Sequence, residues 1–200
     1  MAYSDFTLTT VRKQFGITVV EEMGFFEEIK GRSPSNLLKE IFLDNKPLAL
    51  ASNTEKARSE LLIMPILVEL RRQLNKKISV FSGINFNVEP EKGLNGSCDF
   101  LIAQSQELLT INAPIIALVE AKKEDLNIGI GQCIAEMIAA QIFNEKGGKE
   151  NKRIYGVVTS GTNWRFLKLE GKNVLIDLQE YYVENLEKIL GILIEFCQED

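Results

Sequence analysis

The sequence of 200 residues contains no histidine. This absence excludes a serine and histidine triad, a histidine-based zinc hydrolase and a histidine general base, because each of them needs an imidazole ring. Carboxylates and lysines remain as the side chains suited to hydrolytic chemistry.

Cysteine is scarce and long apolar runs are missing. Cys98, Cys133 and Cys197 are odd in number and widely spaced, which argues against a disulfide framework and a zinc site, so we expect small, mostly buried residues. The longest apolar stretch, 61–68, contains a proline and is too short to cross a bilayer. The first residues lack the basic and apolar segments of a signal peptide. We therefore expect a cytoplasmic protein.

The charge balance is acidic, with a formal net charge of −5. Nucleic-acid binding generally uses a basic surface, so this balance argues against such a partner. Two basic segments stand out, and we interpret both as solvated helix ends, where cations face the negative pole of the helix dipole. They comprise Arg71, Arg72, Lys76 and Lys77 in the first, and Lys146, Lys149, Lys152 and Arg153 in the second.

The first third of the chain predicts helices. Residues 1–50 are expected to form a mainly helical leader with breaks at 31–34 and 45–47. Ser52 and Glu55 have the spacing of a capping box before an apolar periodic segment that ends near residue 74. Pro65 lies in the middle of this predicted helix and costs about 3 kcal/mol unless the helix kinks, so we expect a distortion near Leu61.

The rest of the chain alternates strand and helix patterns. Strands are predicted at 78–88, 98–103, 115–119, 154–159, 164–169 and 174–178, and helices at 128–146 and 183–196. This order predicts one α/β or α+β domain over 1–200, with a mixed sheet flanked by helices. We expect a leader at 1–50, a core at 52–182 and a C-terminal helix within 183–200. Trp164 is interpreted as a core residue, and Gly129 with Gly131 as loosening the start of a helix.

Acidic residues mark the ends of two neighbouring predicted strands. Asp99 opens one, and Glu120-Ala121-Lys122 closes the next. The pattern of an acid, any residue and lysine occurs five times in the chain, so the tripeptide alone is weak evidence. Only this copy follows a buried-type strand that is preceded by a strand carrying an acid. Residues two apart in a strand share a face, so Glu120 and Lys122 should point the same way, with Asp99 completing a candidate site.

This arrangement resembles the PD-(D/E)XK nuclease superfamily with the restriction-endonuclease-like fold, above all the nuclease domain at the N-terminus of type I restriction endonuclease motor subunits. The likeness covers about residues 52–170. It matches Glu60 to a glutamate on the helix before the strands, Gln132 to a glutamine on the helix after the lysine, and 159–164 to a turn and strand with an aromatic residue. Two departures are Glu136, where related families often have tyrosine, and Cys98 in place of the motif's proline.

The resemblance implies metal-dependent hydrolysis of DNA phosphodiesters by an endonuclease of restriction or repair type, leaving 5′-phosphate and 3′-hydroxyl ends. Asp99, Glu120 and the backbone carbonyl of Ala121 would bind Mg²⁺ or Mn²⁺, and Lys122 would position the attacking water.

Two further site assignments keep their alternatives. Glu60 is either a third acid that points inward or a solvated residue. Gln132 either orients the lysine or touches phosphate, or is a polar residue at the edge of an apolar stripe.

Three hypotheses remain open: a Mg²⁺-dependent DNA endonuclease, a catalytically inactive nuclease-like domain that acts as a nucleic-acid or protein interaction module, and an unrelated α/β domain whose charges all lie on the surface. Metal-dependent stabilisation separates the first from the third, because a ligand of the native state raises its melting temperature. Cutting both strands of a duplex needs two active sites, so we expect a homodimer, and a motor or specificity subunit is a further expected partner.

Overall fold

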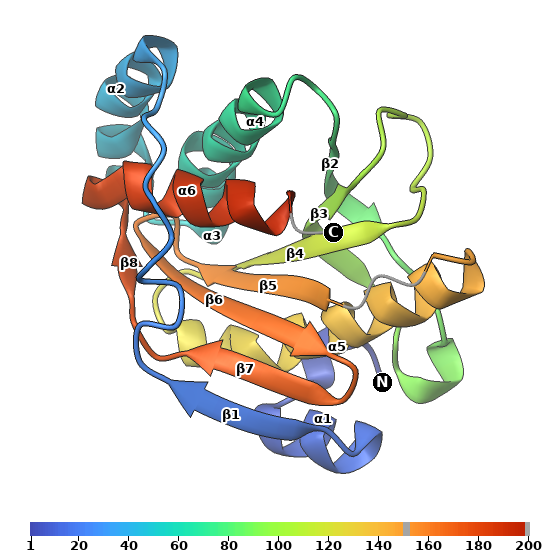
Figure 1. Cartoon of the computed structure of the whole chain (residues 1–200). Coiled ribbons are helices and arrows are strands. Elements are labelled where there is room, and N and C mark those ends of the chain that lie inside the picture. The colour runs from blue at the N-terminus through green and yellow to red at the C-terminus, as the bar shows by residue number, and fades with distance from the viewer. Residues whose placement is uncertain (150–152, 199–200) are drawn as a thin grey trace.

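The structure, a computed structural model, describes residues 1–149 and 153–198 and is built around an eight-stranded mixed sheet (Figure 1). The strand order is β1-β7-β6-β5-β4-β3-β2, with β8 pairing with β6 off this path. The strands are β1 (Thr18–Glu22), β2 (Ser79–Asn85), β3 (Ser97–Ala103), β4 (Ile115–Ala121), β5 (Arg153–Thr159), β6 (Asn163–Glu170), β7 (Asn173–Asp177) and β8 (Tyr181–Tyr182). The predicted mixed sheet is confirmed.

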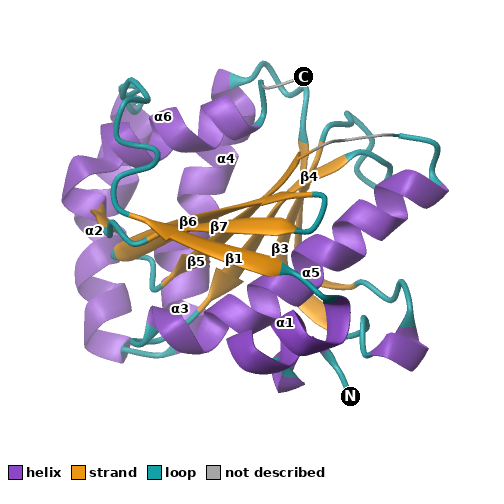
Figure 2. Ribbon diagram, turned by 60° about the horizontal axis from the view of Figure 1, so that its bottom comes forward, coloured by secondary structure: helices purple, strands orange, loops and turns teal. Residues whose placement is uncertain are grey.

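Helices cover both faces of this sheet (Figure 2). They are α1 (Leu8–Phe15), α2 (Asn36–Ser52), α3 (Glu55–Arg58), α4 (Met64–Gln73), α5 (Leu126–Lys146) and α6 (Leu186–Phe196), with short 3-10 turns at Tyr3–Asp5, Pro90–Lys92 and Val183–Asn185. One apolar core joins Leu118 of β4 to Cys133 of α5, and the other joins Val119 to Ile66 of α4 and Ile192 of α6. Successive residues of β4 therefore feed opposite cores, as the alternation of side chains along a strand requires.

The central strand β4 fixes the edge at which the candidate site lies. All seven of its residues are buried. It pairs antiparallel with β3, Phe100 opposite Val119, and parallel with β5, Glu120 beside Val158. The crossover from β4 to β5 runs through α5, so the carboxyl ends of both strands and the start of α5 meet at one edge, where α/β sheets commonly bind ligands.

Helix α5 is apolar because it is a core helix. By length and composition alone it could cross a membrane, with a mean hydropathy of 1.3 over its most apolar window, yet 61% of that window is buried inside the fold. A Cβ atom on Gly131 would lie 2.5 Å from the carbonyl oxygen of Phe6 and 2.4 Å from the carbonyl carbon of Thr7. The glycine thus lets the N-terminal segment pack closely on α5, which corrects our interpretation that it loosens the helix.

The distortion expected near Leu61 is confirmed. A π-helical segment, Ser59–Ile63, separates α3 from α4. Pro65 has no N–H to donate to the Leu61 carbonyl, and the side-chain amide of Asn45 donates to it instead at 3.0 Å. The predicted cap is wrong, because the hydroxyl of Thr54 accepts from the Ala57 N–H while Ser52 ends α2.

The leader differs most from its prediction. The break at 31–34 is confirmed, since α2 begins only after its N-cap Ser35, but the break at 45–47 is wrong because α2 continues through Pro47. The leader also contributes a strand, β1, which pairs with β7. Packing of Leu38 and Ala49 against the rest of the fold outweighs the local cost of the proline.

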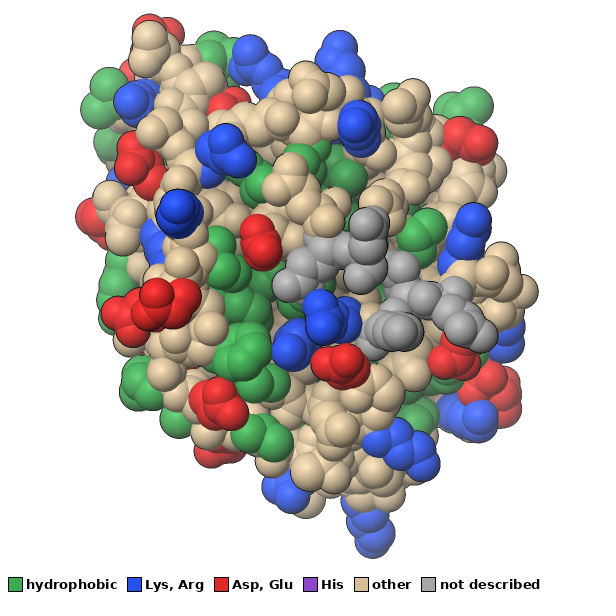
Figure 3. Space-filling view, viewed as in Figure 1, with side chains coloured by type: hydrophobic (Ala, Val, Ile, Leu, Met, Phe, Trp, Pro, Cys, Tyr) green, Lys and Arg blue, Asp and Glu red, His purple; other side chains and the backbone are tan. Residues whose placement is uncertain are grey.

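Several smaller predictions also have an outcome. All three cysteines are free and buried, and Trp164 is fully buried, as expected. Lys146 of the second basic segment is exposed at the end of α5, as expected, and forms an ion pair with Glu89 at 3.3 Å. Lys152 of the second basic segment and residues 199–200 of the predicted C-terminal helix lie outside the described residues. Acidic and basic side chains are interspersed on the face shown in Figure 3.

Candidate active site

Asp99 lies on β3 and contacts β4 through its side chain. Its Oδ2 accepts a hydrogen bond from the Ala121 N–H at 2.8 Å, and the side chain remains partly exposed. Burial raises the pKa of Asp99 above its ordinary value, although the Ala121 hydrogen bond and the charge of Lys122 oppose this shift. The predicted proximity of Asp99 to the Glu120-Ala121-Lys122 segment is therefore present in the structure.

Glu120 is a nearly buried acid with one oxygen that lacks a partner. Its side chain is 2% exposed, and Oε1 forms an ion pair with the Lys122 ammonium. Within the described residues, no hydrogen-bond donor reaches its buried Oε2. Burial, and next the charge of Asp99, raise the pKa of Glu120 to about 8. The carboxylate thus carries a desolvation cost that Lys122 offsets only in part.

Lys122 is held at the end of β4 by its backbone and its side chain. Its N–H donates to the Thr159 carbonyl of β5 at 2.8 Å, and its side chain is 18% exposed. Besides the ion pair with Glu120, its Nζ lies 3.4 Å from Oε1 of Gln132. Burial lowers the pKa of Lys122, but the charge and hydrogen bond of Glu120 outweigh this and raise it. The ammonium therefore stays charged at neutral pH.

Helix α5 brings Gln132 and Glu136 to the same place. Gln132 Nε2 donates to Glu136 Oε1 at 3.1 Å, so the glutamine bridges Glu136 and Lys122. Gly129 lets the start of α5 lie close to the Lys122 side chain, since a Cβ atom on this residue would lie 3.1 Å from that side chain. Glu136 is fully buried, and burial together with the charge of Glu120 raises its pKa well above the ordinary value.

The glutamate expected from the helix before the strands does not point into the site. Glu60 is 62% exposed and lies 3.9 Å from Lys56, an ordinary surface pair, so the structure shows the solvated alternative for this residue. Glu55, at the start of α3, is close enough for its charge to raise the pKa of both Glu120 and Lys122. Glu55 is itself exposed, and within the described residues its side chain makes no hydrogen bond or ion pair with the site, so its influence is that of a nearby charge.

The donor set fits a hard divalent cation bound partly by water. The described part of the chain holds no group of three or more His, Cys, Asp or Glu side chains gathered as a metal site. Mg²⁺ usually binds proteins through one or two carboxylates and completes its shell with water and phosphate oxygens. Asp99 and Glu120 with the Ala121 carbonyl match that set, and the unpartnered Glu120 Oε2 is a buried oxygen that a cation would satisfy.

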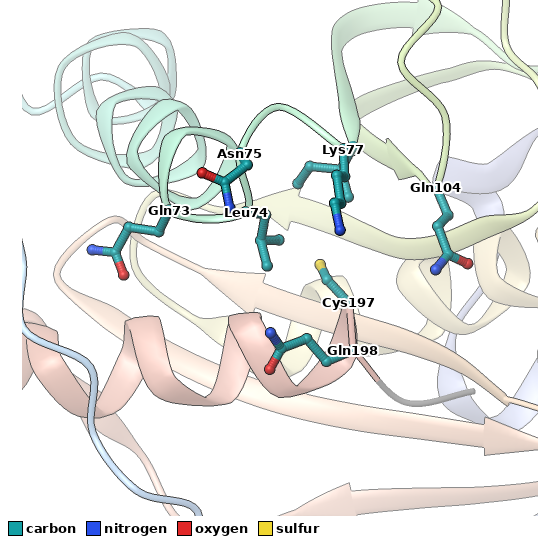
Figure 4. Close-up of a pocket in the computed structure, with 8 residues that line it drawn as sticks. Gln73, Leu74, Asn75, Lys77, Gln104, Cys197 and Gln198 are labelled. Atoms are coloured by element: carbon teal, nitrogen blue, oxygen red, sulfur yellow. The ribbon is translucent and has the colours of Figure 1, made fainter.

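A separate surface pocket of about 400 Å³ lies beyond the other end of β3 (Figure 4). Its lining includes Lys77, Gln104 and Cys197 and has no carboxylate. Burial raises the pKa of the Cys197 thiol to about 12, so it is not a ready nucleophile. We assign no hydrolytic chemistry to this pocket.

Comparisons with protein-family models, with curated proteins and with solved structures each found no match for this chain.

Proposed function

We propose that this chain is a metal-dependent nuclease of the PD-(D/E)XK type that hydrolyses phosphodiester bonds of DNA. One observation carries the proposal: Glu120 is buried beside Asp99, has an oxygen without a partner among the residues that the structure describes, and has a pKa raised to about 8 partly by the Asp99 charge. Two neighbouring carboxylates in a largely buried site repel each other and destabilise the metal-free fold, but together they can bind a divalent cation.

The residues of the site divide the work of phosphodiester hydrolysis between them. Asp99, Glu120 and the Ala121 carbonyl would hold Mg²⁺ or Mn²⁺, which when bound polarises a phosphate and lowers the pKa of a coordinated water. Lys122 supplies a fixed positive charge next to this acid pair, where it can orient the attacking water and stabilise negative charge that develops on the phosphate. Gln132 holds the lysine side chain from the helix side.

The order of elements supports the same assignment. A helix precedes the antiparallel strands β2, β3 and β4, a glutamine-bearing helix follows the lysine, and β5 then pairs parallel with β4. This is the order that the resemblance implies. A homodimer, a motor or specificity subunit and a cytoplasmic location stay predictions.

A second candidate is a nuclease-like domain that binds nucleic acid or protein without cleavage. The net charge of −5 favours the protein-binding form of this candidate, because an acidic chain gains little from contacts with phosphates.

The test is cleavage of plasmid and single-stranded DNA, and of RNA in parallel, in Mg²⁺, Mn²⁺ or EDTA. We expect metal-dependent cutting of DNA by the wild type and its loss in Lys122→Ala. The adjacent Lys123→Ala is a matched control, because Lys123 is exposed and, in the part of the chain that the structure describes, its ion-pair partner is Glu124 at 3.8 Å. Equal cutting by wild type and Lys122→Ala would refute the assignment of Lys122. DNA binding without cutting would favour the second candidate.

A further inference from the structure

A fully buried glutamate on α5 closes a hydrogen-bonded chain that ends at the lysine of the site. Glu136 Oε1 accepts from Gln132 Nε2 at 3.1 Å, and Gln132 Oε1 faces Lys122 Nζ at 3.4 Å. Lysine can only donate, so it needs the oxygen end of the amide, while the accepting oxygen of Glu136 needs the nitrogen end. Both neighbours therefore select the same orientation of the Gln132 amide.

A glutamate at position 136 makes the fold less stable than an apolar residue would. It is 0% exposed, and its second oxygen, Oε2, has no hydrogen-bond partner within the described residues. The α5 residues three and four positions away on the same face, Cys133, Ala139 and Ala140, are all buried and small, so an apolar residue would suit the packing. A buried polar group with an unsatisfied oxygen destabilises the fold, which indicates a role other than stability.

We propose that Glu136 is a positioning residue that acts on Lys122 through Gln132. It fixes the direction of the Gln132 amide and thereby holds the ammonium in the place that the proposed nuclease reaction requires. Without it the amide is free to turn and to present its NH₂ group to the ammonium, two donors that repel each other. The consequence for catalysis rests on the proposed function, whereas the hold on Lys122 does not.

The test measures how readily Lys122 reacts with an amine-acylating reagent, followed by mass-spectrometric peptide mapping, so it needs no nuclease activity. We expect Glu136→Met, which keeps the length and removes the acceptor, to raise labelling of Lys122 by about tenfold, as loss of a hydrogen bond to a charged group does. Glu136→Gln keeps an accepting oxygen and should restore protection. Thermal melting of each variant identifies any loss of folding.

Glu145→Met is the matched control. Gln141 Nε2 donates to Glu145 Oε1 at 3.2 Å with the same four-residue spacing on the same helix, but Glu145 is exposed and belongs to the last turn. This variant should leave labelling of Lys122 unchanged.

A double-mutant cycle decides whether the path runs through Gln132. In a Gln132→Met background, Glu136→Met should add nothing to the labelling of Lys122. If the two substitutions have additive effects on the labelling of Lys122, the proposal is overturned. It is also overturned if Lys122 is labelled as fast in Glu136→Gln as in Glu136→Met while both variants remain folded. If the wild type cuts no DNA but labelling follows this pattern, the proposed function fails and the positioning role stands.

Discussion

Replacing Glu120 by glutamine should stabilise the metal-free protein, and more so at high pH. The glutamine keeps the shape of the side chain and an oxygen that can accept from Lys122, but it cannot ionise. In the wild type the pKa of Glu120 rises from 4.5 to about 8 on folding, because the buried carboxyl group resists ionisation. The substitution removes that resistance together with the charge.

The size of the effect follows from the linkage between protonation and folding. Below pH 4.5 Glu120 is protonated in both the folded and unfolded states, so ionisation costs the fold nothing. Between pH 4.5 and 8 the unfolded state loses its proton first, and the wild type loses about 1.4 kcal/mol of stability per pH unit. Above pH 8 the full loss is roughly 5 kcal/mol at most for this shift. We expect Glu120→Gln to be more stable than wild type by about 2 to 5 kcal/mol at pH 8.5 and by less than about 1 kcal/mol at pH 5.

Urea unfolding in EDTA at both pH values measures this difference. Glu124→Gln is a matched control, because Glu124 is an exposed glutamate four residues further along, and its variant should show no pH-dependent gain. A Glu120→Gln variant that is less stable than wild type at pH 8.5, or that differs equally at both pH values, would refute the reasoning.

Three further results are expected. Mg²⁺ at ten times its dissociation constant should stabilise the wild type by about 1.4 kcal/mol, which raises the melting temperature by about 3 °C. The stability of Asp99→Ala should not change when Mg²⁺ is added. An equal rise in melting temperature for both proteins would mean that the cation binds elsewhere. Gly131→Ala should lose about 1 to 3 kcal/mol in urea unfolding, because its Cβ meets the backbone of Phe6 and Thr7; an unchanged stability would mean that this segment shifts aside without cost. Asn45→Ala should lose about 1 kcal/mol in thermal melting, since the Leu61 carbonyl loses its donor; no change would mean that water replaces Asn45.

The parts of the fold that local sequence patterns describe were predictable. Short β-branched and apolar runs marked the positions of strands β2 to β7, and Pro65 marked the distortion at Leu61. Strand β1 was missed because it lies at an edge, where four of its five residues are exposed and the burial pattern is weak. The break predicted at Pro47 was wrong because tertiary packing, which the local sequence does not show, keeps α2 intact around this proline.

The part of the candidate site that depends on strand geometry was predictable. Asp99, Glu120 and Lys122 follow from the order of two strands and from the two-residue repeat of a strand face. Glu55 acts on the site only through its charge from another helix, and the sequence holds no local signal for this. Glu136 has the four-residue spacing that places it next to Gln132 on one helix, but its full burial depends on the tertiary packing around α5. Gly129 was misjudged likewise, because the need for a small residue arises from Lys122 and Val158 on other elements.

The pairing of β1 with β7 also bears on the order in which the chain assembles. Thr18 pairs with Asn173, so β1 cannot pair with β7 until residue 173 has been synthesised. Closing so long a loop is slow, whereas β4, α5 and β5 can meet earlier through shorter connections. The segment before β1 also docks on α5 at Gly131. We infer that the edge formed by β1 joins last, which pulse-labelled hydrogen exchange would show as late protection of its amides, after those of β4. The candidate site is then assembled on a sheet whose outer edge is still open.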